Sequence, residues 1–296
     1  MRDFLITTDS NSDLPQEYID KLGTVIIPQY YSFGDTVYGD ELHMPPAEFY
    51  QRMKNGELPQ SQANNPAVIE DKFRGILDKG MDIIHIAFSS ALSGSYNNVC
   101  MVANELREEY TDAKITVIDS MNVSLGETII LLHATELKEK GLSYEDIVSD
   151  LEEYKNHINV QFTVDDLFHL QRGGRVSKTT ALVGSALNLK PFLTVTDAGT
   201  LISDGTARGR KKSIRTLVER MKDTLEEIPD TSVPVGIVHG NCFEDAMTVA
   251  DLVKSETGFS NIIINDISPS IGTHAGPGAL GLLYYGKLKP EPKEEK

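Results

Sequence analysis

The chain has 296 residues, of which 40% are hydrophobic and 24% are charged. This composition is typical of a globular protein, and the length exceeds a usual domain of about 100–200 residues, so we expect two domains. The formal net charge of −16 argues against general binding to nucleic acid or to an acidic membrane surface. No apolar run approaches the roughly 20 residues that cross a bilayer, so we expect a cytoplasmic protein without a transmembrane or targeting segment.

The distribution of charge and the cysteine content indicate which kinds of site this chain can hold. Between Arg172 and Arg215 there are nine lysines or arginines and two acids, so this segment carries +7 and the remainder −23. A solvated face or a surface for a partner protein explains such a segment. Cys100 and Cys242 are too few for a disulfide framework. His239 with Cys242 lacks the companions that a structural metal site needs, so we expect no metal.

In chain order, the first half alternates short apolar runs with amphipathic segments. The expected strands cover 4–8, 25–33, 83–88 and 114–118. Pro28 marks an edge or a break in the second of these strands. The expected helices begin near residues 14 and 46, cover 66–77, and follow residues 95 and 125. The expected loops cover 34–44 and 56–62. Alternating strands and helices favour a parallel sheet.

Three of these strands end in a similar polar cluster before a helix. The clusters are Asp9-Ser10, Ser89-Ser90 and Asp119-Ser120. Ligands of open α/β sheets bind outside the carboxyl ends of the strands, so the three clusters are expected to converge on one edge. Each acid taken alone is typical of a helix start or a turn. Three such clusters in one domain, however, favour a ligand-binding site.

The turn over 88–96 joins a buried strand to an amphipathic helix. The first backbone N–H groups of that helix lack intrahelical partners, and the helix dipole adds positive charge, so an anion is favoured there. The serine hydroxyls in this turn can donate to carboxylate or phosphate oxygens. The alternative is that Ser93 or Ser95 simply caps the helix, as serines often do.

The pattern changes near His157, and a second, α+β domain is expected over 158–286. Its expected elements are a strand at 158–164, a short helix to 170 after Asp165-Asp166, an apolar helix with Leu182 and Ala186, a hairpin at 191–203, a helix over 214–228, a strand at 233–238, a helix over 244–255 and a strand at 262–267. A glycine-rich loop with His274 follows, and the charged tail 287–296 is expected to be disordered. The first domain then covers 1–157.

The sequence resembles the DegV family of bacterial fatty-acid-binding proteins. The resemblance rests on four segments in family order: 8–14, 89–96, 167–177 and 272–281. It implies a two-domain α/β protein that holds a long-chain fatty acid between its domains, without a further cofactor. Members of the fatty acid kinase type present the carboxylate to a separate ATP-dependent kinase, which forms an acyl phosphate. A non-catalytic role fits this sequence, which has no G-x-x-x-x-G-K-[ST] pattern.

The resemblance also implies a set of site residues. Ser93 matches the serine that binds the carboxylate, and His274 matches a histidine near it. Arg172 and Arg175 match an arginine pair, of which Arg175 is the better candidate for contacting the kinase or the phosphoryl group. Where the family has a threonine this chain has Gln60, so Gln60 and Ser61 are expected to replace it. The full predicted ligand site is Gln60, Ser61, Ser93, Gly94, Ser120, Thr273 and His274. The apolar stretch 181–189 is a candidate for lining the tail pocket, with core packing as the favoured alternative.

Two other functions compete with this reading. A serine hydrolase would use Ser93 as nucleophile, His274 as base and Asp9 or Asp119 to orient the base. Ala91 argues against it, because a G-x-S-x-G elbow needs glycine at that position. A binder of a small phosphorylated ligand would draw on the basic segment and the glycine-rich loops.

Overall fold

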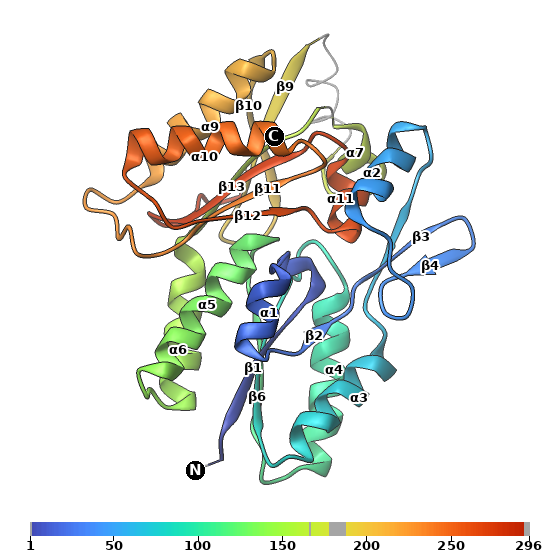
Figure 1. Cartoon of the computed structure of the whole chain (residues 1–296). Helices are drawn as coiled ribbons and strands as arrows, with labels where there is room; N and C mark the ends of the chain where they lie inside the picture. Colours follow the sequence, from blue (N-terminus) through green and yellow to red (C-terminus); the bar gives the residue numbers. More distant parts are fainter. Residues whose placement is uncertain (1, 166, 178–187, 293–296) are drawn as a thin grey trace.

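The structure is a computed structural model that describes residues 2–165, 167–177 and 188–292. Figure 1 shows two larger sheets, one in the N-terminal half of the chain with helices on both faces and one in the C-terminal half with helices on its outer face. The predicted combination of a parallel-sheet α/β unit with a second, mixed α and β unit is confirmed. The apolar helix expected around Leu182 and Ala186, and most of the stretch 181–189, lie outside the described residues.

The first sheet is parallel, with strand order β2-β1-β6-β7. Its strands are β1 (Phe4–Asp9), β2 (Ile26–Ile27), β6 (Asp82–Ala87) and β7 (Ile115–Asp119). Successive side chains point to opposite faces, so Ile83 packs in the core beneath α3 (Pro66–Leu77) and α4 (Ser95–Glu109). Ile84 packs on the other face, against α5 (Leu125–Glu139) and α6 (Tyr144–Tyr154). Burial on both faces explains why these strands read as unbroken apolar runs.

A small antiparallel sheet includes parts of the two loops expected at 34–44 and 56–62. Pro28 interrupts the second predicted strand, and β3 (Tyr30–Phe33) pairs with β4 (Thr36–Tyr38) and β5 (Gln60–Gln62). The loop predictions were wrong at 36–38 and 60–62, because three-residue strands are too short to show a pattern. Figure 1 shows this sheet and α2 (Pro46–Lys54) beside α11 (Pro269–Ala275) of the C-terminal half.

The second sheet has six strands in the order β10-β9-β8-β13-β11-β12. Its strands are β8 (Ile158–Thr163), β9 (Leu189–Val195), β10 (Leu201–Arg208), β11 (Val235–His239), β12 (Ile262–Asp266) and β13 (Leu280–Tyr285). Leu280, Leu282 and Tyr284 pack under α9 (Arg210–Thr224) and α10 (Phe243–Thr257). The alternate residues of β13 face the N-terminal unit. Strand β13 was not predicted from the sequence, although it lies near the centre of this sheet.

Three further elements of the second half differ from expectation. The short helix α7 spans Phe168–Arg172 with Leu167 as its N-cap, so the predicted start at Asp165-Asp166 was too early. Helix α9 ends at Thr224, and Ile228, which the pattern included, is 92% exposed. His274 lies on α11 rather than in a loop. Pro269 in the first turn and Gly276 after the last residue frame this helix, as prolines and glycines commonly do.

The start of the C-terminal tail is packed rather than disordered. Lys289 is buried, and its Nζ donates to the backbone oxygen of Met121 at 2.7 Å. The backbone N–H of Asp197 donates to the oxygen of Pro290 at 3.0 Å, which ties the tail to the β9–β10 turn. The prediction of disorder was therefore wrong for this part of the tail. It rested on the charge of the segment, which does not show that Lys289 has a backbone acceptor in the fold.

The two units meet through α5 and through the loop after β1. Leu125 of α5 packs so closely on β11 that a Cβ on Gly236 would lie 2.7 Å from its Cβ. In the loop, Asp13 is buried and accepts from the N–H of Ser268 at 2.9 Å and from the hydroxyl of Ser124. The backbone oxygen of Asp13 also accepts from Asn265 Nδ2 at 2.7 Å. A division at 157/158, where α6 gives way to β8, stays a prediction.

Burial of Asp13 predicts a loss of stability as the pH rises. Burial raises the pKa of this carboxyl to about 7, although its hydrogen bonds to Ser124 and Ser268 oppose the rise. The unfolded chain releases this proton near 3.8, so the folded state holds more protons between pH 4 and 7. The contribution of Asp13 to stability is therefore complete below pH 4, falls by a few kcal/mol, as an order of magnitude, between pH 4 and 7, and levels off above pH 7.

The measurement is urea unfolding of the wild type and of Asp13→Asn at pH 5 and pH 8. Asparagine keeps the shape and cannot ionise, so the wild type should lose more unfolding free energy than the variant between the two pH values. Equal losses in the two proteins would show that Asp13 does not ionise in this range.

Candidate functional site

The three polar clusters at the ends of β1, β6 and β7 do converge on one edge of the first sheet. The N–H of Phe88 donates to Asp9 Oδ2 at 3.0 Å, and the N–H of Ser90 donates to Asp119 Oδ1 at 3.1 Å. Both acids thus hold the serine turn in place through its backbone. The convergence follows from the parallel sheet, and the acids themselves act as turn residues.

The serine turn fixes the start of α4 and turns Ser93 toward a cavity. Helix α4 begins at Ser95 with Gly94 as its N-cap. Ser93 Oγ accepts from the N–H of Ser95 at 3.2 Å and donates to Ser95 Oγ at 2.9 Å. Ser95 Oγ in turn donates to Gln29 Oε1 at 2.7 Å. Ser93 therefore satisfies a helix-start N–H and also lines the cavity, so both roles considered for it are compatible.

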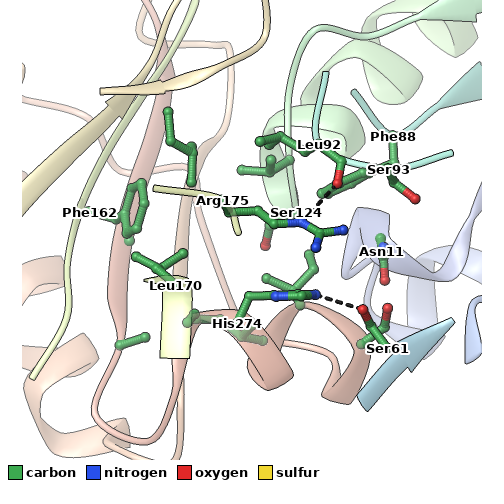
Figure 2. Close-up of a pocket in the computed structure, with 18 of the residues that line it drawn as sticks. Asn11, Ser61, Phe88, Leu92, Ser93, Ser124, Phe162, Leu170, Arg175 and His274 are labelled. Atoms are coloured by element: carbon green, nitrogen blue, oxygen red, sulfur yellow. Dashed lines mark hydrogen bonds between the residues drawn. The ribbon is translucent and has the colours of Figure 1, made fainter. Parts of the chain in front are cut away.

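A cavity of about 270 Å³ lies between the two sheets, with one polar end and one apolar wall (Figure 2). Its polar lining residues are Asn11, Ser61, Gln62, Ser93, Ser124, Arg175, Ser270 and His274. Its apolar lining comes mainly from the second sheet and from α7 and α11, and includes Val160, Phe162, Leu170, Leu201, Val238, Ile271, Ala279 and Leu283. Gln62, Ala63 and Gly94 are exposed, so the polar end opens to solvent, whereas Val160, Val238 and Leu283 are buried.

His274 and Ser61 meet at the polar end, as Figure 2 shows. Their Nε2 and Oγ atoms lie 2.6 Å apart. Burial lowers the pKa of His274 to about 4, and the positive charges of Arg175 and Arg172 act in the same direction. The ring is also tightly enclosed, because a Cβ on Gly173 would lie 2.0 Å from its Nδ1. His274 therefore enters the site as a neutral, fixed hydrogen-bonding group.

The two arginines of the predicted pair have different positions. Arg175 lines the cavity, donates from Nε to the oxygen of Leu92 at 3.1 Å, and also donates to the oxygen of Gly173. Burial lowers its pKa, and within the described part of the chain no carboxylate forms an ion pair with it. Arg172 lies outside the cavity and donates to the oxygens of Pro59 and Thr273. Arg175 is thus the cation available to an anion in the cavity.

Three residues predicted for the ligand site lie outside the cavity lining. Gln60 is exposed and does not line the cavity, whereas its neighbours Ser61 and Gln62 on β5 do. Thr273 Oγ1 donates to the oxygen of Pro269 at 2.9 Å on its own helix. Ser120 is buried, and its hydroxyl donates to the backbone oxygen of Asn122 and accepts from the N–H of the same residue. Of the predicted ligand site, Ser61, Ser93, Gly94 and His274 line the cavity, whereas these three residues do not.

Sequence reasoning missed four polar residues of the lining. Asn11 follows β1, Gln62 is the last residue of β5, Ser124 precedes α5, and Ser270 lies in the first turn of α11. Asn11 lies within a segment that carried the family resemblance, and Ser124 follows the Asp119-Ser120 cluster, so both were within reach of the sequence. Ser270 became visible only once 269–275 was known to be a helix.

The geometry does not assemble the hydrolase alternative. His274 faces Ser61 rather than Ser93, and Asp9 and Asp119 hold backbone groups of the serine turn. In the described ranges His274 Nδ1 has no hydrogen-bond partner, so no carboxylate orients the ring as a triad requires.

The pair His239 and Cys242, considered as metal ligands, contacts other residues. Cys242 Sγ receives a hydrogen bond from Arg210, and His239 Nδ1 lies 3.2 Å from Asp266 Oδ1. Among the residues that the structure describes, no group of three potential ligands is placed to hold a metal ion.

The class that this fold and cavity define is that of two-sheet α/β proteins with an apolar cavity between the sheets. The chain belongs to the DegV family, whose model matches residues 3–287. The resemblance seen in the sequence is thereby confirmed. Across 2–165, 167–177 and 188–292, no helix combines the length and the apolar character needed to cross a membrane.

Individual relatives match along nearly the whole chain. A DegV domain-containing protein of Clostridium perfringens is 35% identical over 291 residues, which are 98% of this chain and 99% of the relative. A crystal structure of DegV from Bacillus subtilis, described as a fatty acid binding protein, is 29% identical with a TM-score of 0.82 and covers 97% of this chain and 100% of its own. A DegV family protein from Thermus thermophilus, solved for its fatty acid binding, is 28% identical with a TM-score of 0.84 at the same coverage.

The burial of His274 predicts that its ring stays neutral across the physiological pH range. In the protein stripped of lipid, the imidazole NMR signal of His274, assigned by its loss in His274→Gln, should not move between pH 5 and 8. Ser61→Ala keeps the burial and should behave in the same way. A titration midpoint near the unperturbed value of about 6.5 would contradict the neutral ring.

Proposed function

We propose that this protein binds a long-chain fatty acid in the cavity between its two sheets. The observation that carries the proposal is the division of the lining into a polar, solvent-facing end and a buried apolar wall. An amphiphile with a small anionic head and a long tail matches that division. The fatty acid binding described for the Bacillus subtilis and Thermus thermophilus relatives supports the same ligand class.

The head group is held at the polar end by neutral donors and one cation. Ser93 and Ser61 offer hydroxyls, Gly94 marks the start of α4, and Arg175 offers a guanidinium without an acid partner among the described residues. Charge-assisted hydrogen bonds of this kind contribute about 1.5–3 kcal/mol each. A carboxylate also offsets the cost of burying the Arg175 charge, which is the cause of its lowered pKa.

The tail contributes most of the affinity. Burying some 15 methylenes at about 0.8 kcal/mol each gives roughly 12 kcal/mol before the ordering costs of binding. The head group therefore sets the orientation of the ligand, while the apolar wall sets how tightly it is held.

The protein acts in the cytoplasm as a non-catalytic carrier that presents the carboxylate to a separate ATP-dependent fatty acid kinase. The opening at Gln62, Ala63 and Gly94 supports this role, because it leaves the head-group end accessible while the tail stays buried. Arg175 at the same end is suited to contact the kinase or a transferred phosphoryl group. A small phosphorylated ligand fits the cavity less well, because it has little apolar surface to bury against the apolar wall.

The experiment is native mass spectrometry of the purified protein, followed by extraction and identification of the released lipid. The expected result is about one long-chain fatty acid per chain. Ser93→Ala removes a donor to the carboxylate and should weaken fatty acid binding by about ten- to a hundredfold. Ser90→Ala is the matched control, because Ser90 lies in the same turn but outside the cavity lining.

Equal weakening by the two serine variants would place the head group elsewhere. A protein that contains no lipid and takes up neither palmitate nor oleate would refute fatty acid binding altogether. Labelling of Ser93 or Ser61 by a fluorophosphonate probe would instead favour a hydrolase.

A further inference from the structure

The apolar wall of the cavity has a gap at its centre. In the second sheet, Gly281 of β13 pairs in register with Phe162 of β8 on one side and with Val238 of β11 on the other. All three line the cavity. The middle position of this row therefore has no side chain, and the two neighbours form the sides of a groove. Glycine in a strand interior weakens the strand and often marks a site where a ligand or another backbone approaches closely.

A second glycine on the same face, Gly236, differs from Gly281 because a side chain from another element fills the space above it. Gly236 of β11 lies two residues before Val238, and Leu125 of α5 occupies the space above it. At Gly281, by contrast, the three nearest atoms to an added Cβ all belong to the sheet itself. These are Val238 Cγ2 at 2.8 Å, Leu283 Cδ1 at 3.6 Å and Phe162 Cβ at 3.6 Å. The nearest neighbours of Gly281 are thus lateral, and the space above it belongs to the cavity.

One end of the groove is closed. Leu283 is the next residue of β13 on the same face, and it packs against the backbone of α5, since a Cβ on Gly126 would lie 3.3 Å from its Cδ2. In the other direction along the strand, the next residue on this face is the small Ala279. Figure 2 places Phe162 on the side of the cavity away from Ser61, Ser93 and Asn11. The groove is therefore far from the polar end.

We infer that Gly281 determines the length of acyl chain that the protein accepts. This inference rests on the proposed fatty acid binding and adds the position of the distal tail, which lies over Gly281 between Phe162 and Val238. A side chain at position 281 would fill the groove and exclude the last methylenes of a long chain. Removing atoms from Val238 would widen the groove and admit more.

The test is competition among saturated fatty acids from dodecanoic to icosanoic acid for protein stripped of lipid, with native mass spectrometry as the readout. Gly281→Ala should shift the preferred chain to a shorter one, with a loss of about fourfold in affinity for each methylene that no longer fits. Val238→Ala should shift the preference to a longer chain. The double variant relieves the 2.8 Å contact with Val238 and should return toward the wild-type profile. Gly75→Ala is the control, since an added Cβ there meets nothing within 4 Å.

The outcomes separate this inference from the proposed function. If the wild type binds no fatty acid of any length, the proposed function fails. If the wild type binds fatty acids but Gly281→Ala and Val238→Ala leave its chain-length profile unchanged, the inference alone is wrong. If Gly281→Ala does not fold, as judged by circular dichroism, Val238→Ala decides, because an unchanged chain-length profile in this variant overturns the inference.

Discussion

The site depends on the contact that Asp13 makes between the two units. Its carboxyl accepts from Ser124 at the start of α5 and from the N–H of Ser268 just before α11, and its backbone oxygen accepts from Asn265. Asn11, Ser124 and, on α11, Ser270 and His274 line the polar half of the cavity. A single buried residue therefore links three parts of that wall. Together with the packing of Leu125 on Gly236, it holds the polar edge of the first sheet beside the apolar face of the second.

Charge is distributed around the cavity in a way that suits an anion. Arg175 lies in the lining without a carboxylate partner among the described residues, and His274 is neutral because burial and nearby arginines lower its pKa. Behind the polar wall, burial raises the pKa of Asp9 to about 6 and that of Asp13 to about 7. Near neutral pH these carboxyls are therefore less ionised than free aspartates, which reduces their repulsion toward a bound carboxylate. The net charge of −16 thus conceals a local environment that is not acidic.

Sequence reasoning reached the first sheet and the serine turn because their signals are local. Buried parallel strands read as apolar runs, and the polar clusters after Asp9 and Asp119 follow from where such strands end. It could not tell that both acids would hold backbone groups, since that depends on which loops lie side by side. It chose Gln60 with Ser61, and only the pairing of β5 with β3 shows which of the two points inward. Helix α11 was within reach, because Pro269 and Gly276 frame it, but the glycines favoured a loop. The missed strand β13 had the largest consequence, since it forms the floor of the cavity.

The most direct test of the account is a crystal structure of the protein loaded with palmitic acid. Density for one acyl chain is expected between the sheets, with a carboxylate oxygen within hydrogen-bond distance of Ser93 Oγ and the methyl end near Gly281. A chain in the reverse orientation, or density elsewhere on the molecule with the cavity closed by side chains, would contradict the central claim that the polar edge of one sheet and the apolar face of the other together form the ligand site.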